Sequence, residues 1–83
     1  MLMKDQSIPI EAIYVPTKRR STLDAKKAEA LAEAILDKGQ QSPILVRRDG
    51  ERFVLVEGLH RLEAMKSLGE TRILATIVQA RRG

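Results

Sequence analysis

Two apolar runs in the middle of the chain place the strongest constraint on its fold. Residues 44–46 and 53–56 flank Asp49 and Gly50, a pair typical of the tight turn in a β-hairpin. Neither run alternates cleanly between apolar and polar side chains, so we expect both faces of the hairpin to be covered, one by helices and one by the rest of a curled sheet. The pattern predicts a partly closed β-structure with helices outside it.

Helical spacing of apolar residues predicts two main helices, one before the hairpin and one after it. The first covers residues 24–38, with a capping residue at its start and Gly39 as its stop. The second covers residues 59–68 and ends at Gly69. Both glycines suit the left-handed conformation that commonly closes a helix.

Two further strands are expected near the ends of the chain. Residues 7–15 contain three isoleucines and predict one short strand, followed by a basic connection over residues 17–21. Residues 72–79 predict the last strand. The expected fold class is therefore α+β, a small curled mixed β-sheet with two main helices.

Length and composition exclude several classes of protein. The 83 residues leave room for one domain over residues 1–83, with a core at about 8–78 and a tail at 80–83. The absence of cysteine excludes disulfides and thiol chemistry, and the single histidine, His60, excludes a histidine-rich metal site. No apolar run is long enough for a signal peptide or a membrane span, so we expect a cytoplasmic protein with no membrane partner.

The charge balance favours an anionic partner. The chain carries 15 lysines and arginines against 11 acidic residues, a formal net charge of +4. Such a balance favours phosphates or nucleic acid as partners. Tyr14 and Phe53 are the only aromatic residues, which argues against a module that stacks bases on aromatic side chains.

The segment that joins the hairpin to the second helix carries the chemistry. It passes through Glu57 and Gly58 from a strand into a helix, where the first helical N–H groups lack partners and attract anions. Arg61 shares a helix face with apolar residues, so its guanidinium needs an anion or must reach solvent. We interpret Arg61 and these N–H groups as a phosphate clamp, with His60 as a second donor or a proton-transfer group.

An ordinary structural interpretation stays open for the same residues. Arg61 can pair with Glu57 or Glu11, and His60 can be satisfied at the surface. Arginines near helix starts commonly pair with carboxylates, and isolated surface pairs contribute only about 0 to 1 kcal/mol. Spacing alone does not separate the two interpretations.

Three blocks of the sequence resemble a known family. They read A-L-A-E-A-I at residues 30–35, G-Q-Q-S-P-I-L-V-R at 39–47 and E-G-L-H-R-L-E-A at 57–64. Together they resemble the ParB-like N-terminal domain of the ParB/sulfiredoxin superfamily, over residues 8–78. The resemblance implies the fold of that superfamily and a nucleotide bound at the glycine turn: CTP in partition ParB proteins, ATP in sulfiredoxin and ADP in a free-serine kinase branch.

The resemblance implies that the turn residues Gly58, Leu59, His60 and Arg61 bind the nucleotide phosphates. Gly58 and Arg61 match the first and last residues of the G-E-R-R pattern of partition ParB proteins. Gly58, His60 and Arg61 match the G-C-H-R pattern of sulfiredoxin, but Leu59 stands in place of its redox cysteine. Reduction of a sulfinic acid is therefore excluded.

The resemblance also implicates residues outside the turn. Lys27 lines up with a helix lysine that sulfiredoxin places near its nucleotide, and Arg20 is the preferred member of a basic stretch similar to a phosphate-contacting loop of the ParB branch. Gln41 and Pro43 resemble positions that line the base and sugar. Glu57 can face a Mg²⁺ ion held through the phosphates of CTP or ATP.

Several functions remain as hypotheses. The first is a nucleotide-dependent switch or accessory of a DNA-partition or plasmid-related system, with a protein partner or a second copy of the chain. The second is a DNA-binding adaptor with a vestigial pocket, in which Arg47, Arg48, Arg81 and Arg82 extend a basic surface toward the DNA backbone. An NTPase or nuclease with His60 as candidate catalytic residue, and a kinase with Glu11, complete the set. No helix-turn-helix follows the matched block, so we expect a partner to read any operator.

Overall fold

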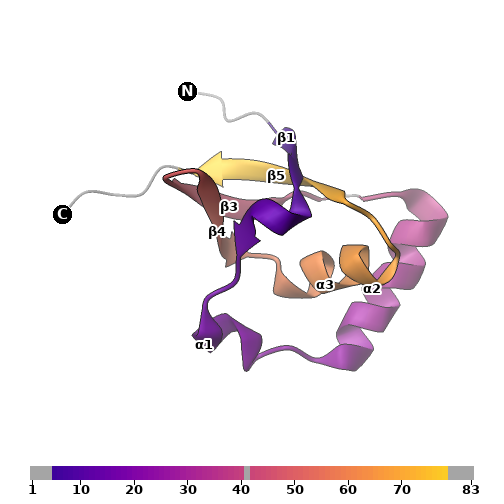
Figure 1. Ribbon diagram of the computed structural model, residues 1–83. Coiled ribbons are helices and arrows are strands. Elements are labelled where there is room, and N and C mark those ends of the chain that lie inside the picture. Colours follow the sequence, from indigo (N-terminus) through magenta and orange to yellow (C-terminus); the bar gives the residue numbers. More distant parts are fainter. Residues whose placement is uncertain (1–4, 41, 79–83) are drawn as a thin grey trace.

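The computed structural model describes residues 5–40 and 42–78. Its elements are β1 (Asp5–Pro9), the 3-10 turn η1 (Ile10–Ala12), β2 (Ile13–Tyr14), α1 (Thr17–Arg20), α2 (Ala25–Lys38), β3 (Ile44–Asp49), β4 (Arg52–Glu57), α3 (Leu59–Ser67) and β5 (Arg72–Val78). The expected α+β architecture with two main helices, α2 and α3, is confirmed (Figure 1). The predicted tail at 80–83 lies outside the described residues.

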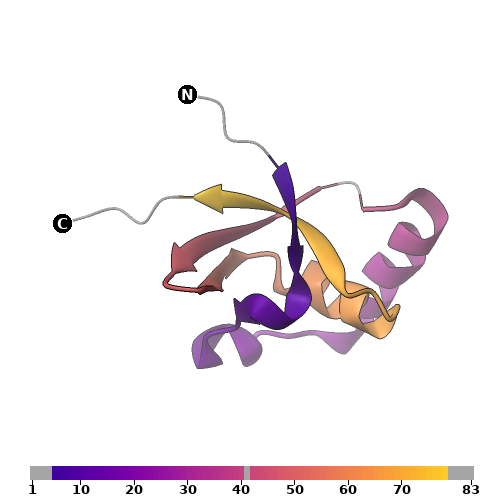
Figure 2. The ribbon, with the colours of Figure 1, turned by 45° about the horizontal axis from the view of Figure 1, so that its top comes forward.

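The strands form one mixed sheet in the order β1-β5-β3-β4-β2. β3 runs parallel to β5 and β2 runs parallel to β4, whereas the β3–β4 hairpin and the β1–β5 pair are antiparallel. β1 and β2 are therefore opposite edges of the sheet, although only η1 separates them in the chain (Figure 2). One short segment reaches both edges because the sheet curls.

The prediction of a single strand over residues 7–15 was wrong, because the segment breaks after Pro9. The N–H of Ile10 donates to the carbonyl of Thr71 at 2.9 Å, outside the β1–β5 ladder. The chain then turns through η1 and pairs with β4 at the other edge. The basic connection that follows is also more ordered than predicted, since Thr17–Arg20 form the one-turn helix α1.

Both main helices begin and end where the local sequence signals place them. The Asp24 carboxylate accepts the N–H of Lys26 at 3.0 Å and caps α2, and Gly39 ends that helix with φ of 79°. Gly69 follows α3 with φ of 78°. Within residues 5–40 and 42–78, no helix is long and apolar enough to cross a membrane.

α2 and α3 lie on one side of the sheet, and the core lies between them and the strands (Figure 1). The largest fully buried side chains there are Ile44, Leu62, Ile73 and Val46. The other face carries Tyr14, Val54 and Arg47 in one row by strand register. It is covered only in part, since Val54 is 5% exposed whereas Tyr14 is 40% exposed.

Candidate functional site

The turn between β4 and α3 is determined by Gly58. Its φ of 112° and ψ of 30° are left-handed, a region that side chains strain to adopt. A Cβ on Gly58 would lie 2.6 Å from Cγ2 of Ile44 on β3. Glycine is therefore required here by its backbone conformation and by its packing against the sheet.

The start of α3 leaves backbone donors available. Leu62 is the first residue of the helix whose N–H bonds within it, to the carbonyl of Gly58 at 2.9 Å, and no side chain caps the helix. The N–H groups of Leu59, His60 and Arg61 precede that bond and lie at the positive end of the helix dipole. The Leu59 side chain is 7% exposed and belongs to the core, so only its backbone is open to the surface.

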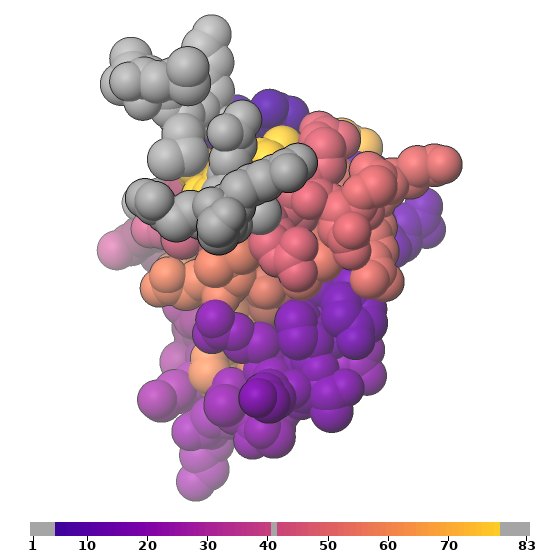
Figure 3. Space-filling model, turned by 90° about the vertical axis from the view of Figure 1, so that its left-hand side faces the viewer, coloured from indigo at the N-terminus to yellow at the C-terminus, as the bar shows by residue number. Residues whose placement is uncertain are grey.

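A hollow of about 360 Å³ opens at this helix start. It is lined by Arg19, Thr22, Leu31, Glu57, Gly58, Leu59, His60 and Arg61. α1 and its linker thus meet the β4–α3 turn, as the indigo-to-purple surface beside the orange surface in Figure 3 illustrates. Two guanidinium groups and one carboxylate give the lining a net positive charge, which favours an anion.

The ion-pair alternative for Arg61 finds no support in the described structure. Within residues 5–40 and 42–78, the salt bridges join Arg52 to Asp49 at 3.1 Å and Lys66 to Glu63 at 3.4 Å. Arg61 is half-buried at the hollow and pairs with neither candidate carboxylate. Its donors therefore remain available to an anion.

His60 makes a hydrogen bond within the protein, as one of its two sequence interpretations allowed. Its Nε2 atom accepts the backbone N–H of Asp24 at 2.9 Å, so this nitrogen is an acceptor and not a donor in the structure. The ring is half-buried and joins the start of α3 to the residue that caps α2. A role in proton transfer stays a prediction.

Three other predicted binding residues, Arg20, Lys27 and Pro43, are outside the lining of this hollow. Arg20 lines a neighbouring hollow with Val15, Leu23, Leu59, Glu63 and Lys66. Lys27 is exposed on α2 and is not part of the lining of either hollow. Pro43 is half-buried just before Ile44, the residue that packs on Gly58, and Gln41 lies outside the described residues.

Sequence reasoning missed Arg19, Thr22 and Leu31 as lining residues. Arg19 belongs to the basic stretch identified in the sequence. The sequence does not indicate which of the three successive basic residues, 18–20, lies toward α3. Thr22 is found only once α1 is known to be helical, since its hydroxyl donates to the Arg19 carbonyl at 2.7 Å. Leu31 carries no chemical signal beyond helical spacing.

The residues present fit a divalent cation only as a companion of phosphates. Glu57 is exposed and lines the hollow, but no group of three or more metal-binding side chains occurs in the described part of the chain. Mg²⁺ prefers several oxygen ligands, and keeps waters when a protein offers one or two carboxylates. Glu57 can therefore complete a shell that phosphate oxygens and water provide.

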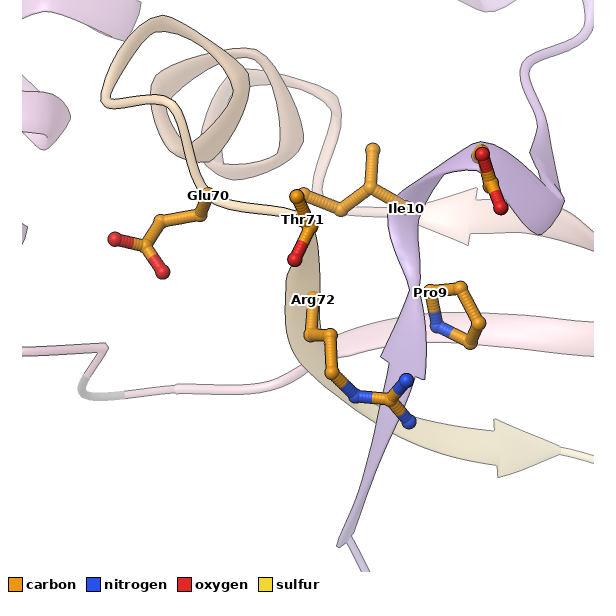
Figure 4. A pocket seen from close by; sticks show the side chains of 6 residues that line it. Pro9, Ile10, Glu70, Thr71 and Arg72 are labelled. Carbon is orange, nitrogen blue, oxygen red and sulfur yellow. The ribbon is translucent and has the colours of Figure 1, made fainter.

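Another hollow, of about 500 Å³, lies between η1 and the start of β5 (Figure 4). The Arg72 guanidinium there is tied to Ser7, donating to its hydroxyl at 3.0 Å and to its carbonyl at 2.7 Å. Glu11 and Glu70 add carboxylates. With its arginine engaged and two acids present, this hollow suits an anion less well than the one at α3.

Comparison with known proteins gives matches over almost the whole chain. The chain is 36% identical over 77 residues to a probable chromosome-partitioning protein ParB of Campylobacter jejuni, covering 89% of this chain and 28% of that protein. A probable plasmid-partitioning protein ParB of Thermus thermophilus is 35% identical, with coverage of 86% and 23%. The chain thus spans about a quarter of the length of these curated relatives.

Solved structures agree in fold. Sulfiredoxin from Arabidopsis thaliana superposes with a TM-score of 0.83 at 30% identity, covering 93% of this chain and 86% of that one. The C-terminally truncated chromosome-partitioning protein ParB from Caulobacter crescentus, complexed with CTP-gamma-S, has a TM-score of 0.81 at 26% identity, with coverage of 94% and 46%. The ParB N-terminal domain family matches residues 3–82, so the chain belongs to that family, within the ParB/sulfiredoxin superfamily.

Proposed function

We propose that the hollow at the start of α3 binds the phosphates of a nucleoside triphosphate, CTP or ATP, together with Mg²⁺. The observation that carries the proposal is the meeting of the uncapped α3 N-terminus with Arg19 and Arg61 in one hollow. Backbone N–H groups cradle an anion, and guanidinium groups supply bidentate, charge-assisted hydrogen bonds. Glu57 faces the cation that accompanies the phosphates.

Two relatives support the choice of ligand. The Caulobacter ParB structure contains CTP-gamma-S and shares this fold at 26% identity. A free serine kinase in complex with ADP shares the fold at 22% identity, with a TM-score of 0.77. From the partition proteins among the relatives we further propose that nucleotide binding acts as a switch in a DNA-partition or plasmid-related system, with DNA or another protein as the responding partner.

Calorimetric titration tests the proposal. Wild-type protein is titrated with ATP, ADP, CTP and GTP, each with and without Mg²⁺, and compared with Arg61→Ala and Arg48→Ala. Arg48 carries the same charge near the end of β3, with its guanidinium carbon 5.0 Å from the centroid of the Phe53 ring and outside the lining of the hollow, so it controls for net charge. We expect binding of one triphosphate by wild type and Arg48→Ala, and at least about a tenfold loss in Arg61→Ala.

Absence of heat with every nucleotide would contradict the proposed function. A parallel titration with a DNA duplex at increasing salt then distinguishes the alternative. Binding that falls steeply with salt and ignores sequence would favour the DNA-binding adaptor with a vestigial pocket.

A further inference from the structure

A groove of about 480 Å³ lies between α2 and α3, which pack side by side (Figure 1). Its floor is an apolar strip of one leucine and small side chains: Leu23, Ala25, Ala28 and Ala32. Leu36 shares this face of α2, because it follows Ala32 by one helical turn. Leu23 is 41% exposed and Leu36 is 77% exposed, so the apolar strip has an exposed leucine at each end. A continuous apolar surface of this kind is typical of contact with another molecule.

Acidic side chains from both helices border the apolar strip. Glu29 and Glu33 line the groove from α2, and Glu63 lines it from α3, where Lys66 pairs with it at 3.4 Å. Asp37 continues the α2 row, since Glu29, Glu33 and Asp37 follow one another at intervals of four residues. Among the described residues that line the groove, none is a lysine or an arginine. The groove is therefore acidic in a chain whose net charge is +4.

The acidic row of α2 is unfavourable for the domain by itself. Like charges four residues apart repel each other on a helix, and Asp37 lies near the negative end of the helix dipole. Within residues 5–40 and 42–78, the two salt bridges leave Glu29, Glu33 and Asp37 unpaired. A partner that supplies cations would relieve this repulsion. The row is thus better explained by binding than by a structural role.

We infer that this groove binds a basic amphipathic helix of a partner protein. The apolar face of that helix lies on the apolar strip, and its lysines or arginines lie against the acidic side chains of α2 and α3. The strip from Leu23 to Leu36 is roughly 20 Å long at about 1.5 Å per helical residue, which accommodates about four turns of a docked helix. Alanines in the floor allow close approach. Nucleic acid is disfavoured, because the acidic side chains repel phosphates.

This surface is separate from the hollow at the start of α3. The two share no lining residue, and their charges have opposite sign. A nucleotide and a basic helix can therefore bind the same molecule at different places.

A synthetic helix of about 14 residues is the probe. It consists of alanine, leucine and arginine, with the leucines in one stripe and the arginines in rows on both sides of it. A control peptide has the same composition, with its positions shuffled so that the arginines surround the helix. Fluorescence anisotropy of the labelled peptides is measured with the full chain. We expect saturable binding of the probe, at least about tenfold tighter than binding of the shuffled peptide.

Variants with matched charge test the acidic row. Glu29→Gln combined with Glu33→Gln removes two acids at the groove, whereas Glu51→Gln combined with Glu70→Gln removes two exposed acids outside it. Probe affinity is expected to fall about fivefold or more in the first variant and less than about twofold in the second. Leu36→Gln keeps helix propensity and is expected to weaken the probe about tenfold, because the leucine loses its apolar contact.

Urea unfolding supplies a readout of opposite sign. The unfolding midpoint of Glu33→Gln is expected to rise above that of wild type, since the variant removes two like-charge contacts, while its probe affinity falls. A side chain with a structural role would lower the midpoint on replacement. Circular dichroism checks that Leu36→Gln keeps the helix content of wild type.

Four outcomes overturn the inference. The first is absence of probe binding up to about 1 mM. The second is equal binding of the probe and the shuffled peptide, which would reduce the effect to charge alone. The third is a fall in the unfolding midpoint of Glu33→Gln with unchanged probe affinity. The fourth is a wild-type dimer in sedimentation that Leu36→Gln dissociates, which would assign the groove to a second copy of the chain.

Discussion

The two walls of the hollow are built in different ways. On one side, Gly58 packs on Ile44 and the Leu62 side chain is fully buried, so the start of α3 is part of the core. On the other side, Arg19 and Thr22 belong to α1 and its linker, where hydrogen bonds replace burial. We call the wall formed by Gly58 and the start of α3 the core wall, and the wall formed by α1 and residues 21–24 the linker wall. Mutations in the core wall should mainly change the stability of the fold. Mutations in the linker wall should mainly change the affinity for a ligand.

Gly58→Ala gives the largest expected effect, because it strikes the core wall. The left-handed conformation costs an alanine about 1 to 2 kcal/mol, and overpacking against Ile44 adds about 1 to 3 kcal/mol. We expect the free energy of unfolding in urea to fall by about 2 to 5 kcal/mol.

Gly50→Ala is the matched control for that prediction. Gly50 has φ of 63°, but a Cβ there meets nothing within 4 Å. The Gly50→Ala variant should lose only about 1 to 2 kcal/mol in the free energy of unfolding, from the cost of the left-handed backbone alone. Equal losses in the two variants would show that contact with Ile44 contributes nothing and that the core wall is less tightly packed than the structure indicates.

The same contrast explains what could be predicted from the sequence. The strand, the glycine turn and α3 follow from local signals: an apolar run, a glycine and helical periodicity around Leu62. α1 has no apolar residues at helical spacing, so local signals do not predict its single turn. Whether Arg19 or Arg20 lines the hollow depends on how α1 and residues 21–24 meet α3. His60 was recognised as a site residue, but its bond to Asp24 joins residues far apart in sequence.

The prediction of one strand over residues 7–15 was wrong for a related reason. Its isoleucines are typical of a strand, and β1 and β2 do pair within the sheet. The break between them depends on the bond from Ile10 to Thr71, a partner at the far end of the chain. Propensity is local, whereas the point at which a strand changes edges is decided by tertiary pairing.

Replacing Arg19 and Arg20 in turn sharpens the comparison on the linker side. Arg19 lines the hollow, whereas Arg20 lines its neighbour. Arg19→Ala should weaken Mg-nucleotide binding about tenfold, because it removes a charge-assisted hydrogen bond, and Arg20→Ala should weaken it less than about twofold. Calorimetry on both variants checks this, and a larger effect of Arg20→Ala would restore the assignment made from sequence.

Asp24→Ala probes the residue where the two walls meet. It removes the cap of α2 but keeps the backbone N–H that donates to His60. We expect a loss of about 1 kcal/mol in stability, measured by urea unfolding, with Mg-nucleotide affinity within about twofold of wild type. Asp37→Ala, in the last turn of α2, is the control. A large loss of affinity with little loss of stability would mean that the carboxylate serves the site and not the helix.

Thr22→Val should have the smallest effect, and it isolates the linker wall from the core. The change keeps the shape of the side chain but removes the hydroxyl that holds the Arg19 carbonyl at 2.7 Å. Loss of one hydrogen bond at an exposed position should cost about 0.5 kcal/mol of stability and about twofold in Mg-nucleotide affinity.

Ser21→Ala is the matched control. It removes a similar bond, from the Ser21 hydroxyl to the Lys18 carbonyl at 2.8 Å, at a residue outside the hollow. If both variants lose stability alike and only Thr22→Val loses affinity, the bond acts by placing Arg19. Equal losses of affinity would instead mean that the whole of α1, rather than its contact with the hollow, tunes binding.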